Sequence, residues 1–577
     1  MERRVLLVFA LTFLILMVGQ PLLVKLGVLK PPAPQQQQQQ QTQQAQPTPQ
    51  APASVSAAPT AVSTAQAKQA SSETESVIEN DLYRIVFTNK GAQVKSWVLK
   101  KYTDDHGNPQ ELVNPYAAPR YGYPLSLWTY DAGLRDKLNS VLYVPTVQGV
   151  QAAPAEVSFE YADGDVSVRK TFRFDHSYVV RVDTAVTRGG ANVNAYPAWP
   201  GSFGDQKVPQ SYAMQEIDFR TGEKIIRLKP DKKGKELSGG NTVRTPFYYA
   251  GPVSQYFSAI FLPDDPSAAS LVTLRNSIEI PEKPNNPDSK KVLVEVLGAA
   301  VGNAFGPTSQ RVYVGPNSVD ALEAVKASAM QGQGGPPPDL GGVVDFGWFG
   351  IIAKPLFLWL KWTQQHMIPN WGWAIAFLTV VINLALLPLR ISQMKSSLKM
   401  QRLQPQMNAI RDKYKKYAMR DPRRAQMNQE VAALYKEHGV NPIGGCLPLL
   451  LQFPFLVAFY KMLTVAIELR HAKWLWVSDL AAPDPYYILP VSIIIFTVIM
   501  QRMTPMAGMD PAQQRMMNIM MPVMLGLFAW SVAAGLALYW LVGTVIAIVV
   551  QMAMNRTSMG REMRDMMEKR ARKQQAR

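Results

Sequence analysis

The chain has 577 residues, and its 60 lysines and arginines exceed its 43 aspartates and glutamates, giving a formal net charge of +17. The single cysteine excludes an internal disulfide and a multi-cysteine zinc or iron–sulfur site. The five histidines have no H-E-x-x-H or H-x₃₋₅-H spacing, which argues against a histidine metal site. The sequence has no GxxxxGK[ST], strand-linked GxGxxG or GxSxG motif, which argues against nucleotide-dependent and α/β-hydrolase chemistry. We therefore expect no metal, no cofactor and no enzymatic activity.

The positive charge is unevenly distributed along the chain. Residues 77–340 are balanced, with 28 basic and 28 acidic residues. The surplus lies beside apolar runs, mainly in 392–440 (11 basic, 4 acidic) and 555–577 (8 basic, 3 acidic). Basic residues on one side of apolar spans are typical of the cytoplasmic side of a membrane. Nucleic-acid binding is the alternative for a basic protein, but this placement argues against DNA as a partner.

The N-terminal part predicts a membrane anchor followed by a linker. Residues 1–30 carry Arg3 and Arg4 before a long apolar run, which fits an uncleaved transmembrane anchor better than a cleaved signal peptide. Residues 31–76 are rich in proline and glutamine, so they cannot bury enough apolar surface to order themselves. We expect a disordered linker there.

Residues 77–330 predict an antiparallel β-sandwich. Alternating apolar and polar residues recur at 82–88, 157–161, 166–174, 178–187, 292–298 and 311–314, separated by proline, glycine and asparagine clusters. The domain has no cysteine, so an oxidising compartment would leave it unchanged. By the charge asymmetry it should lie on the outer side of the membrane, opposite the basic segments.

The C-terminal half predicts a helical membrane domain. Residues 331–367 read as a linker and an interfacial amphipathic helix, because Trp348, Trp359 and Trp362 alternate with lysines. Apolar stretches follow in 371–391 and, as four spans, in 441–554. With the anchor this makes six spans, of which five form the core, and both termini are cytoplasmic. The expected fold is a multi-domain α+β membrane protein.

Residues 392–440 predict a cytoplasmic helical hairpin, and 555–577 a basic cytoplasmic tail. Apolar residues of the first arm form a heptad seam: Met400, Leu403, Met407, Ile410, Tyr414 and Tyr417. Asp421 and Pro422 offer an N-cap and first residue for a second arm that carries Met427, Val431, Leu434 and His438, while Pro405 should kink or start the first arm. The basic residues near the tip either set topology or contact lipid, ribosomal RNA or nascent chain: Arg411, Lys413, Lys415, Lys416, Arg423 and Arg424.

The spans carry neutral polar residues but no ionisable residue near their middles, which argues against proton- and ion-coupled transport. These polar residues either form bonds between helices or line a wet cavity. The candidate groove residues, with one cation at a span end, are Thr379, Asn383, Arg390, Gln452, Asn518, Ser531, Tyr539 and Thr544.

Several motifs resemble the YidC family of membrane protein insertases. They are NPIGGCLPLLLQFPF at 441–455, DPYYILP at 484–490, Pro388-Leu389 followed by Leu403-Gln-Pro405, and GLALYW at 535–540. The resemblance implies insertion and folding of inner-membrane proteins, alone or with the Sec translocon, through a hydrophilic groove open to the cytoplasm and the lipid. It also implies that nascent membrane proteins, the Sec translocon with its accessory subunits, the ribosome and anionic lipids are partners in the bacterial inner membrane.

One position departs from the family pattern. Many relatives carry a basic residue five positions before the Pro-Leu pair, where this chain has Asn383. Arg390, two helical turns further on, is a possible substitute. A solute transporter or channel, and an envelope assembly protein anchored by its spans, are the alternative functions.

Overall fold

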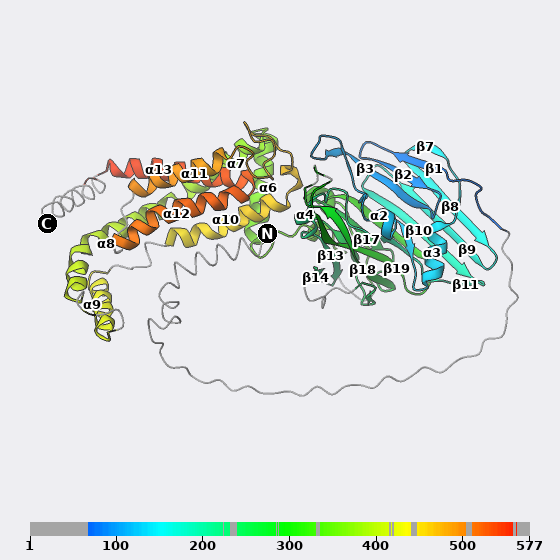
Figure 1. The fold of residues 1–577 in the computed structure, drawn as a ribbon, viewed down its shortest axis with the longest axis horizontal. Helices are drawn as coiled ribbons and strands as arrows, with labels where there is room; N and C mark the ends of the chain where they lie inside the picture. Colours follow the sequence, from blue (N-terminus) through cyan, green and yellow to red (C-terminus); the bar gives the residue numbers. More distant parts are fainter. Residues whose placement is uncertain are drawn as a thin grey trace, which may run out of the picture.

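The structure is a computed structural model that describes residues 67–222, 224–230, 239–283, 286, 288–330, 335–414, 417, 421–439, 447–503, 511–557 and 561. A β-rich domain lies at one end of the molecule and a group of helices at the other (Figure 1). The predicted anchor 1–30, most of the linker 31–76 and most of the tail 555–577 lie outside the described residues.

The described strands form three sheets, in the orders β4-β3-β2-β1-β7, β14-β13-β16-β17-β20-β10-β9-β8-β6 with β11 beside β10, and β15-β18-β19-β12-β5. The pairs are antiparallel except β1 with β7, so the predicted sandwich contains one parallel pair that alternation did not indicate. The strands are β1 Glu75–Glu79, β2 Tyr83–Thr88, β3 Gln93–Thr103, β4 Pro109–Glu111, β5 Ser126–Trp128, β6 Val144–Pro145, β7 Gly149–Ala152, β8 Ala155–Asp163, β9 Val166–Phe174, β10 Val179–Arg188, β11 Ala191–Asn192, β12 Tyr196–Trp199, β13 Glu216–Thr221, β14 Lys224–Leu228, β15 Thr242–Val243, β16 Tyr249–Val253, β17 Phe257–Pro263, β18 Ala269–Pro281, β19 Lys291–Asn303 and β20 Thr308–Pro316.

The sheets pack through the apolar faces that the alternation creates. Phe87 of β2 lies 5.8 Å from Phe159 of β8 and 4.9 Å from Phe172 of β9, measured between ring centroids. These aromatic rings join the first sheet to the largest one, and they belong to one continuous buried cluster that also includes residues of β18 and β19.

Lys170 of β9 is fully buried in this sandwich. Its Nζ donates to the backbone carbonyl oxygens of Gly91, Ala92 and Leu125 at 3.2, 2.5 and 2.6 Å. Burial lowers the pKa of Lys170 to about 7. The side chain thereby holds the turns before β3 and β5 against β9.

Both predicted linkers are shorter than the sequence indicated, because their ends bury backbone and apolar groups. Lys68 pairs with Ala162 of β8 through backbone hydrogen bonds, and β1 begins at Glu75, within the linker predicted over 31–76. In the second segment, Leu340, Val343 and Phe346 are buried. Composition alone missed these contacts, since they form with residues far along the chain.

The described helices of the β domain are short: α2 Ala118–Tyr121, α3 Ala132–Ser140, α4 Pro209–Tyr212 and α5 Val319–Glu323, with the 3₁₀ turn η1 Gly341–Val343 after them. The helical part contains α6 Gly350–His366, α7 Trp371–Ala385, α8 Leu387–Tyr414, α9 Arg423–Glu437, α10 Leu447–Val465, the 3₁₀ turn η3 Ile467–Leu469, α11 Ile488–Met503, α12 Pro511–Ser531 and α13 Ala534–Asn555. Within the described residues, α13 alone is long and apolar enough to cross a membrane, and four shorter apolar segments accompany it at 371–385, 453–465, 488–503 and 518–531.

Helix α6 lies within residues 331–367, for which the sequence predicts an interfacial amphipathic helix, and it has one buried face and one exposed face that carries apolar side chains. Ala353, Leu356 and Phe357 are buried, whereas Ile351 and Trp362 are exposed. Pro355 lies inside the helix without ending it. The buried face packs against α7 and α10.

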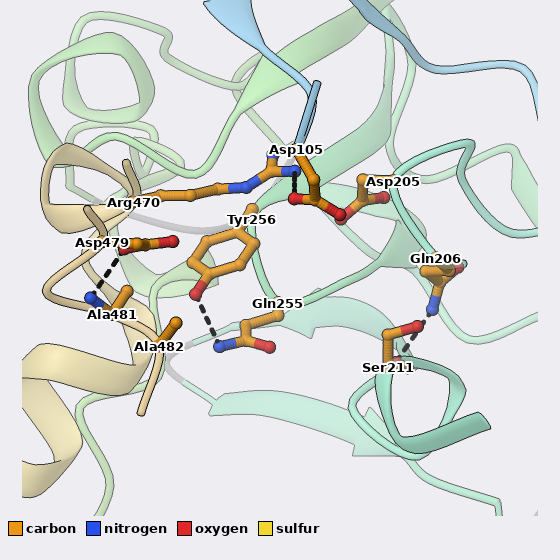
Figure 2. Close-up of a pocket in the computed structure, with 10 residues that line it drawn as sticks. All are labelled: Asp105, Asp205, Gln206, Ser211, Gln255, Tyr256, Arg470, Asp479, Ala481 and Ala482. Atoms are coloured by element: carbon orange, nitrogen blue, oxygen red, sulfur yellow. Dashed lines mark hydrogen bonds and ion pairs between the residues drawn. The ribbon is translucent and has the colours of Figure 1, made fainter. Parts of the chain in front are cut away.

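The β domain and the helices share a second hydrophobic cluster, which contains residues of β16, β17 and β20 as well as α6, α7, α10 and α13. Arg470, between α10 and α11, also contacts the β domain. Its Nη2 donates to Gln110 at 3.1 Å and lies 3.8 Å from an oxygen of Asp105, and its guanidinium lies 5.1 Å from the ring centroid of Tyr256. Figure 2 shows the cavity of about 160 Å³ around Arg470, where burial raises the pKa of Asp205 to about 6.

Replacing Arg470 with alanine should loosen this junction. The change removes a hydrogen bond from a charged donor, worth about 2 kcal/mol, and a positive charge that acts on both Asp105 and Asp205. We expect a lower temperature of half-denaturation and faster proteolytic cleavage between α5 and α6. Lys473→Ala, an exposed change in the same loop, is the control. Equal cleavage rates for the two variants would contradict a docking role for Arg470.

Candidate functional site

Two of the predicted groove residues lie on one buried face of α7. Asn370 caps this helix, accepting a hydrogen bond from the Trp373 backbone N–H at 3.2 Å. Thr379 Oγ1 donates to the Ile375 carbonyl and Asn383 Nδ2 donates to the Thr379 carbonyl, both at 2.7 Å. With its amide nitrogen engaged in this way, Asn383 presents its Oδ1 as an acceptor.

Arg390, which lies in the next helix α8, donates a hydrogen bond to Asn383 Oδ1. Its Nη2 donates to Asn383 Oδ1 at 2.8 Å, although the two residues are seven positions apart. Pro388 cannot donate a backbone hydrogen bond, which explains why α7 ends at Ala385 and α8 begins at Leu387. Helical side chains tilt toward the N-terminus, so the long Arg390 side chain reaches back across this break. A positive charge therefore lies at Asn383.

Helix α13 supplies the opposite wall of the cluster. A Cβ added to Gly543 would lie 3.9 Å from Asn383 Nδ2 and 4.0 Å from Thr379 Cγ2, so the glycine backbone faces both side chains. Tyr539, one turn earlier, is buried, and its ring stacks on that of Phe459 in α10 at 4.1 Å. Tyr539 is also near enough to Arg390 to interact electrostatically with its guanidinium.

Among the described residues, no hydrogen bond links the remaining predicted groove residues to this cluster. Ser531 is exposed and its hydroxyl donates to the Phe528 carbonyl at 3.1 Å. Thr544 is half-buried and donates to the Trp540 carbonyl at 2.9 Å. Asn518 is exposed on α12, and the Gln452 side chain lies outside the described residues. Their role in a groove stays a prediction.

Helices α8 and α9 cover most of residues 392–440 and pack antiparallel, and the cytoplasmic position predicted for this segment stays a prediction. Tyr435 donates to Met407 Sδ at 3.3 Å and Tyr414 donates to Glu430 at 2.7 Å. The seam residues Met400, Leu403, Met407 and Tyr414 are buried. The pair lies at the end of the helices furthest from the β domain (Figure 1).

Two details of the hairpin differ from the sequence prediction, and a third is narrowed. Pro405 lies within α8, so it does not mark the start of the helix, and the predicted kink stays a prediction. Pro422 rather than Asp421 is the N-cap of α9, although the Asp421 carboxylate accepts from the Arg423 N–H at 2.9 Å. His438 is exposed, because α9 ends at Glu437 and Tyr435 takes the seam position.

The basic residues of the tip have local partners where they are described. Lys413 pairs with Glu430 at 3.0 Å, and the guanidinium of Arg423 lies 4.2 Å from the ring centroid of Tyr417. Hydrogen bonds from Tyr414 and Lys413 lower the pKa of Glu430. Arg411 is half-buried on α8, whereas Lys415 and Lys416, and the Arg424 side chain, lie outside the described residues. Contacts with external partners therefore stay a prediction.

Comparison with known proteins places the chain in a family. The family model described as the 60Kd inner membrane protein matches residues 362–562, and the model described as the YidC periplasmic domain matches residues 75–359. The membrane protein insertase YidC of Geobacter sulfurreducens is 32% identical over 493 residues, which are 82% of this chain and 85% of that protein. The membrane protein insertase YidC of Ralstonia nicotianae is 30% identical over 519 residues, 86% of each chain.

Among solved structures, an active YidC insertase with its first transmembrane domain resolved aligns with a TM-score of 0.36 and 20% identity, covering 85% of this chain and 95% of that one. The family matches define an inner-membrane protein with a periplasmic β domain, and not an enzyme. The chain belongs to the YidC family of membrane protein insertases.

Proposed function

We propose that this protein inserts hydrophobic segments into the inner membrane by admitting their polar tails at the cluster of Asn383, Arg390 and Gly543. The observation that carries the proposal is the hydrogen bond from Arg390 to Asn383, which puts a cation beside the glycine face of α13. Relatives with a basic residue at the position of Asn383 would supply this charge directly. In this chain Arg390, which follows the break between α7 and α8, supplies the positive charge.

The physical role of the cluster is to lower the cost of moving a polar tail through hydrocarbon. A charged side chain at the bilayer centre costs about 3 kcal/mol on insertion scales. An acidic tail beside the Arg390 guanidinium recovers part of that cost by charge pairing. The apolar segment behind it gains about 25 cal/mol per Å² on leaving water, which drives its release into lipid without nucleotide hydrolysis.

The proposed topology has six spans: the N-terminal anchor 1–30 and five core segments that correspond to α7, α10, α11, α12 and α13. Both termini, the α8–α9 hairpin and the tail 555–577 then lie in the cytoplasm, where their basic surplus belongs. The separation of the hairpin from the periplasmic β domain supports this arrangement (Figure 1). Groove roles for Gln452, Asn518, Ser531, Tyr539 and Thr544 form part of the proposal.

The proposed partners follow from the same arrangement. Nascent membrane proteins are the substrates, with the Sec translocon and its accessory subunits acting beside the insertase. The basic hairpin and tail would contact the ribosome or anionic lipids. Tip residues Arg411, Lys413, Lys415, Lys416, Arg423 and Arg424 carry the positive charge for that contact.

An insertion assay tests the proposed function. The full chain would be reconstituted in liposomes and given a short single-span substrate with an acidic N-terminal tail. We expect protease protection of the tail at several times the level seen in protein-free liposomes. Protection equal to that of protein-free liposomes, together with flux of a small solute through the same vesicles, would favour a transporter or channel instead.

A further inference from the structure

A second cavity lies between the β domain and the outer end of α10. It has a volume of about 130 Å³, and since a water molecule takes about 30 Å³ of liquid, it has room for a small polar group. Its walls come from the segments around α4, β16 and η1 and from the last turns of α10. We call it the junction pocket.

The junction pocket contains an acceptor that has no donor. Asn317 is 4% exposed; its Nδ2 donates to the Ser254 carbonyl at 2.9 Å, and its Oδ1 is buried with no hydrogen-bond partner. A buried acceptor without a donor is unfavourable, because it has lost its hydrogen bonds to water. The lining therefore favours a ligand that brings an N–H or O–H donor to this oxygen.

Charges of both signs line the same pocket. Glu216, 8% exposed, pairs with Lys229 at 3.0 Å and with Arg227 at 3.5 Å. Asp345, also in the lining, interacts electrostatically with Arg227, Lys229 and Lys461. A ligand with one positive and one negative group complements this lining better than a singly charged ion does.

The pocket lies where phospholipid headgroups are expected. Lys461 is four residues before the end of α10 at Val465, about 6 Å along the helix axis. The Lys461 side chain runs beside Gly347, and the next residue, Trp348, is 93% exposed. Exposed tryptophan and lysine at a helix end are typical of the membrane–water interface.

We propose that the junction pocket binds the headgroup of a phospholipid with a primary ammonium, that is, an ethanolamine phospholipid of the outer leaflet. The ammonium donates to Asn317 Oδ1 and lies beside Glu216, while the phosphate lies beside Lys461. A choline headgroup has no N–H to donate, and a glycerol headgroup has no positive charge for Glu216. The membrane depth of this site rests on the topology proposed above.

Binding is measured with the purified full chain in detergent, titrated with dihexanoyl lipids that share their acyl chains and differ in headgroup. The readout is the shift in the temperature of half-denaturation. We expect half-maximal stabilisation at a concentration at least tenfold lower for ethanolamine than for choline or glycerol. The affinity should fall stepwise through the mono-, di- and trimethylated ethanolamine lipids, because each methyl group removes one N–H donor.

Two variants locate the site. Lys461→Met should abolish the ethanolamine preference, whereas Lys473→Met, an exposed change at the same end of the helices, should keep it. Equal stabilisation by all headgroups, stronger stabilisation by glycerol, or an unchanged preference in Lys461→Met would each overturn the proposal. Since the wild-type methylation series needs no variant, misfolding of Lys461→Met does not decide the outcome. The readout is independent of insertion, so failure of the insertase proposal is recognised separately.

Discussion

Lys170→Met should lower the free energy of unfolding of the β domain by at least about 2 kcal/mol at pH 9. At that pH the buried side chain is a neutral amine. Its two N–H groups donate to two of the three carbonyl oxygens of Gly91, Ala92 and Leu125 at a time, and the substitution removes both donors. Methionine keeps most of the side-chain volume, so the loss reflects hydrogen bonding rather than a cavity.

The pH dependence of this loss has a definite sign. Burial puts the pKa of Lys170 at about 7 in the folded domain, below its ordinary value of 10.5. Between these values the unfolded chain binds the proton more tightly, so the Lys170 contribution to stability rises with pH by about 1.4 kcal/mol per unit. Below pH 7 both states are protonated and the contribution is constant. The difference between wild type and Lys170→Met should therefore be largest near pH 10 and smallest below pH 7.

The measurement is urea-dependent proteolysis of the full chain between pH 6 and pH 10. Lys95→Met is the control, because Lys95 is exposed on β3 and its contact is a surface ion pair with Glu75. In the Lys95→Met control, the free energy of unfolding should depend on pH as it does in the wild type. A Lys170→Met difference that stays constant across the range would contradict a buried, titrating lysine.

Arg390→Gln should reduce insertion of a substrate with an acidic tail by at least tenfold. Two unit charges 4 Å apart interact by about 4 kcal/mol at an effective dielectric constant of 20, and tenfold corresponds to about 1.4 kcal/mol. Glutamine keeps a donor for Asn383 Oδ1 but removes the charge. A substrate with a neutral tail should change less than about twofold, and Arg502→Gln, at the exposed end of α11, is the control for general loss of positive charge.

The position of the charge is tested by exchanging the two residues. Asn383→Arg combined with Arg390→Asn moves the guanidinium to the position that relatives use while keeping the pair. We expect insertion of the acidic-tailed substrate to recover to within about threefold of wild type in liposomes. Equal insertion of acidic and neutral tails by Arg390→Gln would show that the cation does not select the tail.

The sequence was sufficient to predict the β-sandwich and the helical hairpin, because both have regular apolar periods. The alternation along β9 also indicated that the Lys170 side chain is buried. Val166, Val168, Lys170, Phe172 and Phe174 alternate along β9, so the lysine shares the inward face with four apolar residues. A charged residue on that face should have suggested a buried ammonium with backbone acceptors.

Other features depended on geometry that the sequence does not encode locally. In an uninterrupted helix, Asn383 and Arg390 are about 10 Å apart along the axis. Their contact depends on the break at Pro388 and on the reach of the arginine side chain. The contacts of Arg470 and Asn317 connect residues more than 60 positions apart, and no local pattern predicts such pairings.

Disulfide cross-linking between the insertase and a substrate tail most directly tests whether the tail enters at the Asn383–Arg390 cluster. In a Cys446→Ser background, Gly543→Cys places a thiol beside Asn383, and Val545→Cys places one on a 36% exposed face of the same helix. A ribosome-stalled substrate would carry one cysteine in its acidic tail. We predict at least tenfold more cross-link from position 543 than from position 545, and a loss of that excess in Arg390→Gln. Equal cross-linking from both positions, or more from position 545, would contradict entry of the tail at this cluster.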